Sequence, residues 1–301
     1  MRTLTLGLAL GSGGTKGAAH VGVMKALEAA GLKVDVVAGT SIGALYGGAY
    51  ATGRSPLEMD EAIRSCPIID LMSFFRHRLK LRHDNRLARR FFEALGGHQI
   101  ENLPMKFAAT ASDLVERREV AITSGPLIDA IEASIAIPMI ARPVSHQGRF
   151  LLDGGVWEPA PVDAAAALGA DVIVAVHLGQ PYLLPLRAHR PALWLAGRLE
   201  RVPLHRTAAG FVFSLHATAR ERRPGRSAGV IIRPSLRQYA GRSAFHMDKC
   251  IDAGEAAARE ALPVIRALLA GEPVPVEAEV PEPAAELEAA PGGLQPELGG
   301  S

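Results

Sequence analysis

Cysteines, aromatic residues and long apolar runs are all scarce in this chain of 301 residues. The two cysteines, Cys66 and Cys250, are too few for a disulfide scaffold and have no metal-ligand spacing, so a reducing cytoplasm is the expected compartment. Aromatic residues make up 5% of the chain, and the core must therefore be built from Ala, Val, Leu and Ile. No apolar stretch reaches the roughly 18–20 residues that span a bilayer. The apolar start of the chain breaks at Gly11, which favours a buried strand over a signal peptide.

The charge is unevenly distributed, although its formal net value is only +2. Residues 272–301 hold seven Glu, six Pro and no Lys or Arg, and we expect them to form a disordered tail. Residues 76–90 contain seven Lys or Arg and one acid, and residues 187–242 contain twelve Arg and two acids. Such basic runs favour an anionic partner, and no nucleic-acid motif accompanies them, so an anionic membrane surface is the partner we expect. A solvated Arg-rich face is the alternative.

Short apolar segments alternate with segments of helical periodicity along most of the chain, a pattern typical of an α/β layered fold. We therefore expect a three-layer α/β/α sandwich with a mainly parallel central sheet. Residues 1–271 are expected to form one catalytic domain, of which 182–271 is the Arg-rich and helical C-terminal part. The predicted strands lie at 4–10, 34–38, 106–111, 119–123, 150–152 and 172–176, and the predicted helices at 18–30, 42–51, 126–134, 161–168 and 249–270.

Residues 39–43 read Gly-Thr-Ser-Ile-Gly and match the nucleophile-elbow pattern G-x-S-x-G. They lie between a predicted strand and a predicted helix, which is the context that this motif requires. Gly39 and Gly43 leave room around the sharp turn that exposes Ser41. The N-terminus of the following helix favours negative charge that develops nearby.

A glycine-rich loop at residues 11–17, Gly-Ser-Gly-Gly-Thr-Lys-Gly, links the first predicted strand to the first predicted helix. It fails the phosphate-loop pattern because no Gly-Lys pair is followed by Ser or Thr. It also fails the dinucleotide pattern because Lys16 stands where the third glycine is needed. Consecutive glycines do let backbone N–H groups face a common point. The loop is therefore interpreted as the oxyanion hole of an enzyme whose nucleophile is Ser41.

The base that would activate Ser41 is less directly indicated by the sequence. None of the ten histidines stands out, because His20 lies within a predicted helix and His177 ends a predicted strand. Asp153 follows a short apolar segment and precedes Gly154 and Gly155, which leave space around its carboxylate. An Asp-Gly-Gly sequence is by itself usually only a turn. The residues alone leave both an aspartate base and a Ser-His-Asp arrangement open.

Taken in order, these motifs resemble those of the patatin-like phospholipase family, namely G-x-G-G-x-[RK]-G, G-x-S-x-G and D-G-[GA]. In this sequence they are Gly11–Gly17, Gly39–Gly43 and Asp153–Gly155. Residues 133–138 and 161–171 also look like those of bacterial members, related to lysophospholipase and neuropathy-target-esterase catalytic domains. The resemblance covers about residues 5–178.

The resemblance implies a patatin-like fold and a Ser–Asp dyad without histidine, in which Ser41 is the nucleophile and Asp153 the base. It also implies no metal, calcium or organic cofactor. Lys16 stands at the family's Arg/Lys position and either braces the loop, which we favour, or meets the substrate's phosphate. Two residues depart from the usual pattern: Ser12 replaces a frequent Gly, and Glu158 replaces a frequent Asn. The backbone N–H groups implied to form the oxyanion hole are those of Gly13, Gly14 and Thr15, with Gly11 and Gly17 as motif support.

The function expected from this resemblance is hydrolysis of lipid esters, as phospholipase A or lysophospholipase, through an acyl-enzyme. One alternative is a Ser-His-Asp esterase, although an elbow at residue 41 is unusually early for that arrangement. Another is a non-catalytic regulatory or membrane-binding protein on the same fold. The expected partners are a lipid substrate and an anionic membrane surface, and the expected location is the cytoplasm or the inner face of the membrane.

Overall fold

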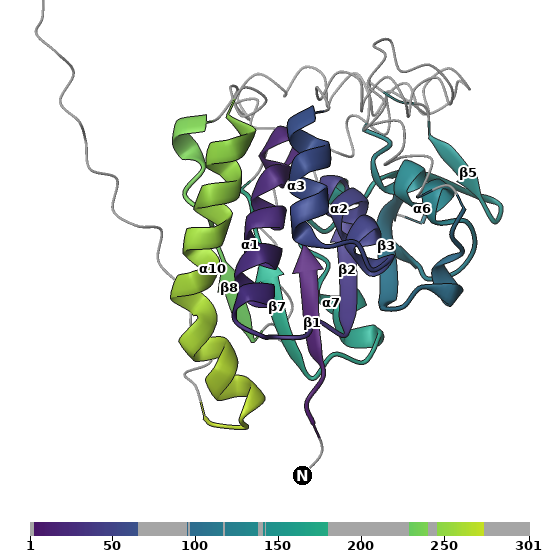
Figure 1. Ribbon diagram of the computed structural model, residues 1–301. Helices are drawn as coiled ribbons and strands as arrows, with labels where there is room; N and C mark the ends of the chain where they lie inside the picture. Colours follow the sequence, from purple (N-terminus) through teal and green to yellow (C-terminus); the bar gives the residue numbers. More distant parts are fainter. Residues whose placement is uncertain are drawn as a thin grey trace, which may run out of the picture.

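The computed structural model describes residues 3–65, 95, 97–116, 118–137, 141, 143–179, 229–239 and 246–273. Eight strands of these segments form one sheet, shown in Figure 1, in the order β5-β6-β3-β2-β1-β7-β8, with β4 also paired to β3. The strands are β1 (Leu6–Leu10), β2 (Val36–Thr40), β3 (Lys106–Asp113), β4 (Arg118–Ile122), β5 (Val144–His146), β6 (Arg149–Asp153), β7 (Val172–Val176) and β8 (Val230–Ile232).

The central part of the sheet is parallel, as the alternation of strands and helices predicts. β1 pairs in parallel with β2 and β7, β2 with β3, and β7 with β8. The antiparallel pairs are confined to β3–β4, β3–β6 and β5–β6. The carboxyl ends of the five parallel strands therefore lie at one edge of the sheet, where ligands bind in open α/β sheets.

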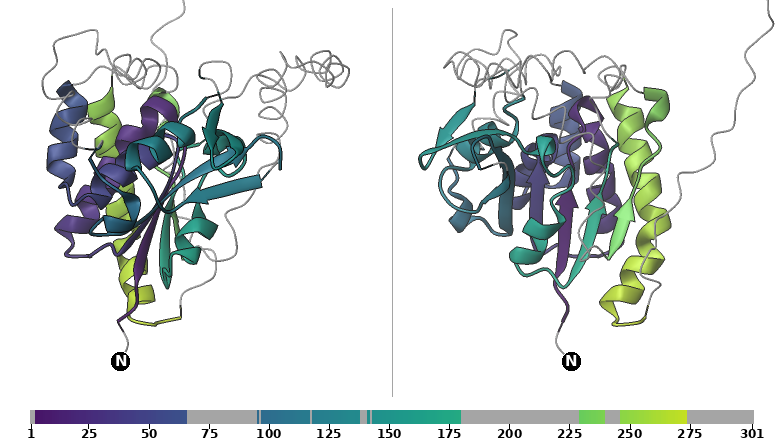
Figure 2. Two further views of the ribbon diagram at one scale, coloured as in Figure 1. Left: turned by 90° about the vertical axis from the view of Figure 1, so that its right-hand side faces the viewer. Right: turned by 180° about the vertical axis from the view of Figure 1, so that it is seen from behind.

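Helices cover both faces of the sheet and make it the middle of three layers, which Figure 2 shows from the side and from behind. Helices α1, α2, α3, α6 and α10 share one apolar cluster with the first face. On the second face, α7 packs against a smaller cluster. The helices are α1 (Ala18–Ala29), α2 (Ile42–Ala51), α3 (Pro56–Ser65), α6 (Leu127–Ser134), α7 (Val162–Ala167) and α10 (Met247–Leu269), and short 3-10 turns occupy Gly14–Gly17, Ile100–Asn102, Gly154–Val156 and Arg237–Tyr239.

Alanine side chains form a row across the sheet beneath α7. Ala9 pairs with Ala38 and Ala175, and Ala38 pairs with Ala108, so the four residues stand side by side on four strands. All four are fully buried in the smaller cluster, together with residues of α7. Because successive strand residues point to opposite faces, their neighbours Leu8, Val37 and Val174 fill the larger cluster instead. Small side chains on one face and branched ones on the other explain a core with few aromatic residues.

Most predicted elements appear with boundaries shifted by a few residues, and α2 coincides with its predicted range. A capping box also forms at the start of α3, where the backbone N–H of Ser55 donates to Glu58 and the Ser55 hydroxyl accepts from the Glu58 N–H. Strands β5 and β8 were not predicted, since each has only three residues.

The basic run at 76–90, most of 187–242 and the tail from 274 onward lie outside the described residues. Within the described segments, no helix is both long enough and apolar enough to cross a membrane.

The first prediction concerns the contact between α1 and α10. A Cβ atom built at Gly22 would lie 1.9 Å from the backbone oxygen of Ile251, and one at Gly254 would lie 2.0 Å from that of Ala19. The two helices therefore touch backbone to backbone, and Gly22→Ala must force them apart. We expect it to lower the free energy of unfolding by about 1–3 kcal/mol, measured by urea denaturation. Gly97→Ala, where an added Cβ meets none of the described residues within 4 Å, is the control and should leave stability unchanged. Equal stabilities of the two variants would contradict the close approach.

Candidate active site

Strand β3 brings two distant parts of the chain together, because three strands pair with it. Ala109 and Thr110 pair with both β2 and β4, whereas the residues Ala111–Asp113 pair with both β4 and β6. A strand has two edges, so β4 occupies one of them and β2 and β6 share the other, end to end. The last residue of β2, Thr40, stands opposite Thr110, and the last residue of β6, Asp153, stands opposite Ala111.

The meeting of these two strand ends puts Ser41 beside Asp153, 112 positions apart in sequence. The Ser41 hydroxyl donates a hydrogen bond of 2.5 Å to Oδ2 of Asp153. Both side chains are nearly shielded from solvent, with exposed fractions of 6% for Ser41 and 3% for Asp153. The structure thus brings together the two residues that the sequence motifs single out.

Ser41 has a backbone conformation that side chains rarely adopt, with φ 56° and ψ −121°. Such a conformation costs on the order of 1–3 kcal/mol and persists only where the surroundings impose it. It turns the chain sharply from β2 into α2, where the N–H groups of Ala44 and Leu45 donate back to the Ser41 carbonyl. This is the strand–turn–helix geometry that the G-x-S-x-G pattern predicts.

The glycine loop and the serine turn pack closely because two glycines permit it. A Cβ at Gly17 would lie 2.3 Å from the Ile42 side chain, and a Cβ at Gly43 would lie 2.1 Å from the backbone oxygen of Leu10. The start of α2 is therefore pressed against the end of β1 and the loop that follows it. Residues Gly14–Gly17 of that loop form a 3-10 turn that leads directly into α1.

The glycine loop also touches the Asp-Gly-Gly turn and the end of β7. A Cβ at Gly155 would lie 2.8 Å from Oγ of Ser12, so the buried Ser12 side chain lies against the turn that carries Asp153. Glu158 lies in the next turn, where its N–H donates to the carbonyl of Gly154. The Lys16 ammonium donates to the carbonyl of Leu178 at 2.8 Å, and desolvation lowers the pKa of Lys16.

The Asp153 carboxylate has a hydrogen-bond donor on each oxygen. Oδ1 accepts from the N–H of Gly155 at 2.8 Å, and Oδ2 accepts from Ser41. Burial nevertheless outweighs these bonds and raises the pKa of Asp153 from 3.8 to about 6. At neutral pH the group is therefore mostly ionised, yet it is a stronger base than an ordinary carboxylate. A base of this kind can take the proton of the serine that it already contacts.

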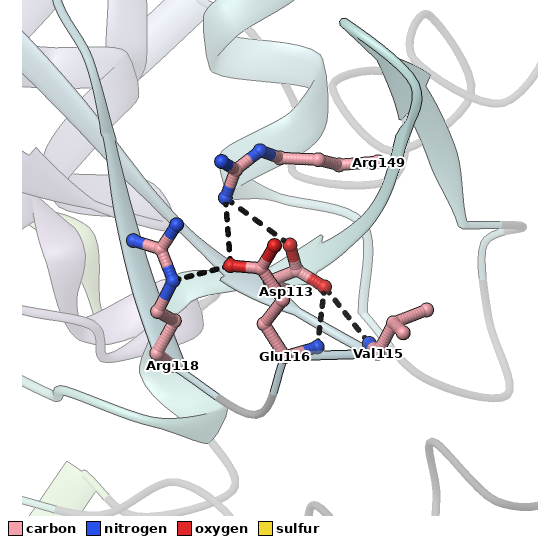
Figure 3. Close-up of polar contacts among 5 residues, drawn as sticks. All are labelled: Asp113, Val115, Glu116, Arg118 and Arg149. Carbon is pink, nitrogen blue, oxygen red and sulfur yellow. Dashed lines mark hydrogen bonds and ion pairs between the residues drawn. The ribbon is translucent and has the colours of Figure 1, made fainter.

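A second cluster of charges, drawn in Figure 3, holds the other end of β6. The Asp113 side chain is 1% exposed and accepts from the N–H groups of Val115 and Glu116. Nη1 of Arg149 lies 3.4 Å from Asp113 Oδ2 and 3.2 Å from Glu116 Oε2. Arg149 is the first residue of β6, and Asp153 is its last. These ion pairs tie the strand to β3 at the end opposite the Ser41 contact.

The described histidines do not explain how Ser41 would be activated. His20 is fully buried and its Nε2–H donates to the carbonyl of Gly11 at 2.8 Å, while desolvation lowers its pKa to about 4. His177 accepts the N–H of Gly179 through Nδ1, and His146 lies at the end of β5. Neither Ser41 nor Asp153 bonds to a histidine within the described segments. The same segments contain no group of three His, Cys, Asp or Glu side chains arranged to hold a metal.

Sequence reasoning missed several residues around the dyad. Ser134, Ser112 and Thr110 have buried hydroxyls, which bond to the backbone of Ser41, to the backbone of Asp153 and to the hydroxyl of Thr40 respectively. The available signal was polarity at the carboxyl end of an apolar strand, where Thr110, Ser112 and Asp113 interrupt β3. Ser134 ends α6 and belongs to the stretch 133–138, which resembles bacterial patatin-like proteins, but no pattern within this chain assigns it a role.

A mixed α/β sheet in which a serine in a strained turn lies against a buried carboxylate is an arrangement typical of hydrolytic enzymes. The sequence model of the Patatin-like phospholipase family matches residues 8–166. The chain belongs to that family.

The relatives found by comparison carry names of the same kind. An uncharacterized NTE family protein of Mycobacterium tuberculosis is 36% identical over 197 residues, which are 62% of this chain and 54% of that protein. The lysophospholipase nte1 of Aspergillus fumigatus is 36% identical over 182 residues, 58% of this chain and 12% of the fungal protein. The chain thus spans about half the length of the mycobacterial relative and far less of the fungal one. Among solved structures, VipD from Legionella pneumophila aligns with 89% of this chain and 67% of its own, at 12% identity and a TM-score of 0.46.

The second prediction follows from the buried Asp153 carboxylate. Its pKa in the folded protein, about 6, lies above the ordinary value of 3.8, so folding disfavours the ionised form. The penalty is absent below about pH 4, grows as the pH rises towards 6 and stays constant above it. We expect Asp153→Asn to be more stable than the wild type at pH 8, on the order of 2–3 kcal/mol, with the difference disappearing towards pH 4.

Urea denaturation at several pH values between 4 and 8 measures this difference. Ser41→Ala is the control, because it keeps the buried carboxylate and should keep the loss of stability as the pH rises. An Asp153→Asn variant no more stable than the wild type at pH 8 would contradict the desolvation argument.

Proposed function

We propose that this protein hydrolyses the carboxylic esters of lipids, as a phospholipase A or a lysophospholipase, through a dyad of Ser41 and Asp153. The observation that carries the proposal is the 2.5 Å hydrogen bond between Ser41 Oγ and Asp153 Oδ2. It joins two motifs of the family to which the chain belongs. The names of the relatives, NTE family protein and lysophospholipase, support lipid esters as the substrate class.

In the proposed reaction, Asp153 accepts the hydroxyl proton of Ser41 while the serine oxygen attacks the ester carbonyl. A tetrahedral oxyanion forms and collapses, and the alcohol or lysolipid leaves with the proton from Asp153. Water then attacks the acyl-serine, Asp153 takes a proton from that water, and the fatty acid is released as Ser41 is reprotonated. The raised pKa of Asp153, about 6, supports its role because a base near the working pH transfers protons most effectively.

The oxyanion is assigned to the glycine loop, through the backbone N–H groups of Gly13, Gly14 and Thr15. Within the described residues, the N–H groups of Gly13 and Gly14 donate to no backbone carbonyl. Gly14 has φ +57°, and a Cβ there would meet none of the described residues within 4 Å, so none of them covers this side of the loop. The contact of Gly17 with Ile42 supports the assignment, because it holds the loop against the serine turn. One such donor is worth about 2.7–4 kcal/mol of transition-state stabilisation.

Lipid substrates lie at a membrane surface, and we include that surface in the proposal. Anionic lipid would attract the two basic runs, which contain seven Lys or Arg at 76–90 and twelve Arg at 187–242. The protein would then be located in the cytoplasm or peripherally at the inner face of the membrane.

The third prediction tests the dyad by fatty-acid release from lysophosphatidylcholine micelles, diacyl phospholipid vesicles with and without anionic lipid, and p-nitrophenyl butyrate. Ser41→Ala should lose at least about 10³-fold in kcat because the nucleophile is gone. Asp153→Asn should lose about 10²–10⁴-fold because an amide cannot accept the proton.

Two matched variants control for indirect effects in this assay. Ser55→Ala removes a hydroxyl from the cap of α3, and Asp35→Asn alters a carboxylate that accepts the N–H of Leu6. Both should keep full activity. Loss of activity in Ser41→Ala alone would reopen the Ser-His-Asp alternative, and an inactive wild type that no serine-directed probe labels would favour a non-catalytic protein.

The fourth prediction separates the two roles considered for Lys16. The bond from Lys16 to the carbonyl of Leu178 supports bracing of the glycine loop. Lys16→Met should therefore lower kcat/KM by a similar factor, about tenfold, for phospholipids and for p-nitrophenyl butyrate, which has no phosphate. A loss confined to the phosphate-bearing substrates would show instead that Lys16 contacts the headgroup.

A further inference from the structure

We propose that Ser134 is a positioning residue for the reaction, and that the short segment from Ser134 to Ala136 holds nucleophile and base in place at once. The proposal rests on the proposed function and adds to it a residue outside the three motifs. Its basis is a pair of buried hydrogen bonds that run from this segment, one to Ser41 and one to Asp153.

The first bond fixes the peptide group of the nucleophile. Oγ of Ser134 accepts the backbone N–H of Ser41 at 2.8 Å and donates to the carbonyl of Thr110 at 2.6 Å. Ser134 is fully buried, and Thr110 stands opposite Thr40 in the β2–β3 pair. The hydroxyl therefore links the residue after β2 to the backbone of β3, at the point where β2 ends and the sheet no longer holds it.

The second bond fixes the base from the same segment. Two residues beyond Ser134, the carbonyl of Ala136 accepts the backbone N–H of Asp153 at 2.9 Å. Ala136 is itself buried, and its neighbour Ile135 closes α6 with a bond back to Ile131. The end of α6 thus contacts the backbone of both dyad residues, whose side chains bond directly to each other.

This arrangement has a chemical consequence for Ser41. Its φ of 56° is unfavourable for a residue with a side chain, and a buried N–H without an acceptor would add to that cost. Ser134 removes the second cost and sets the orientation of the peptide, and hence the direction of Oγ. The N–H of Ser41 is also withdrawn from the oxyanion, which leaves that task to other donors such as those of the glycine loop.

The test measures kcat and KM of four variants with the best substrate of the fatty-acid release assay, and their thermal stability. Ser134→Ala removes the hydroxyl, and we expect kcat to fall about 10–100-fold with KM within about twofold, because the attacking oxygen is misplaced while substrate binding is intact. Ser134→Thr and Ser134→Val have the same shape and differ in the hydroxyl alone. Thr should retain most of the wild-type kcat, and Val should resemble Ala. Thr52→Val removes a hydroxyl that donates to the carbonyl of Ala49 away from the dyad, and should lower stability without changing kcat.

A purely structural role for Ser134 predicts different results. Wild-type kcat in folded Ser134→Ala, or equal kcat in the Thr and Val variants, would overturn the proposal while leaving the dyad untouched. If the branched variants fail to fold, Ser134→Ala decides alone. Ser41→Ala is assayed in parallel to separate failure of this inference from failure of the proposed function. If the wild type has no activity that depends on Ser41, both the proposed function and this inference are overturned.

Discussion

The structure depends on one edge of β3, where β2 and β6 meet end to end. Thr110 and Ala111 are neighbours on that strand, and their partners are Thr40, which precedes Ser41, and Asp153. When a serine bonds directly to a carboxylate, no imidazole lies between the two groups. The distance between the hydroxyl and the carboxylate must therefore be correct by itself. A slip of one residue would move Asp153 by about 3.3 Å and turn its side chain to the other face of the sheet. The ion pairs of Arg149 with Asp113 and Glu116 at the far end of β6 oppose such a slip.

The same site contains two features that lower the stability of the folded protein, and the surrounding residues must compensate for them. Ser41 is held in a rare conformation, and Asp153 is almost fully buried with a pKa raised to about 6. Backbone donors and hydroxyls compensate for part of this: Gly155 donates to the carboxylate, and Ser112 donates to the carbonyl of Asp153. A fully solvated carboxylate would not lower the free energy of unfolding in this way, but it would be a weaker base. Burial of the Asp153 carboxylate thus lowers stability at neutral pH and, in the proposed function, makes this group a more effective proton acceptor.

Sequence patterns anticipated the parallel core and the three motifs because each is local. Leu6–Leu10 and Val172–Val176 are apolar throughout, as expected for strands buried on both faces, and Gly39–Gly43 carries its own strand–turn–helix context. Non-local features could not be read in the same way. The sharing of one β3 edge by β2 and β6 depends on pairing between residues more than 40 positions apart, for which no periodicity exists. Ser134 is likewise an unremarkable helix-end serine until α6 is placed against Ser41.

Close approach of backbones explains why so many of the motif positions are glycine. At Gly17, Gly43 and Gly155 a Cβ would fall within 3 Å of Ile42, the Gly11 carbonyl and Ser12 respectively, so each glycine marks a contact between two of the three motif segments. The three motif segments therefore pack directly against one another: the glycine loop contacts the serine turn, and the Asp-Gly-Gly turn contacts the glycine loop. A side chain at any one contact would push two of these segments apart, and a direct Ser–Asp hydrogen bond tolerates little change in distance. The glycines shape the distance between Ser41 and Asp153 as much as they shape the turns in which they occur.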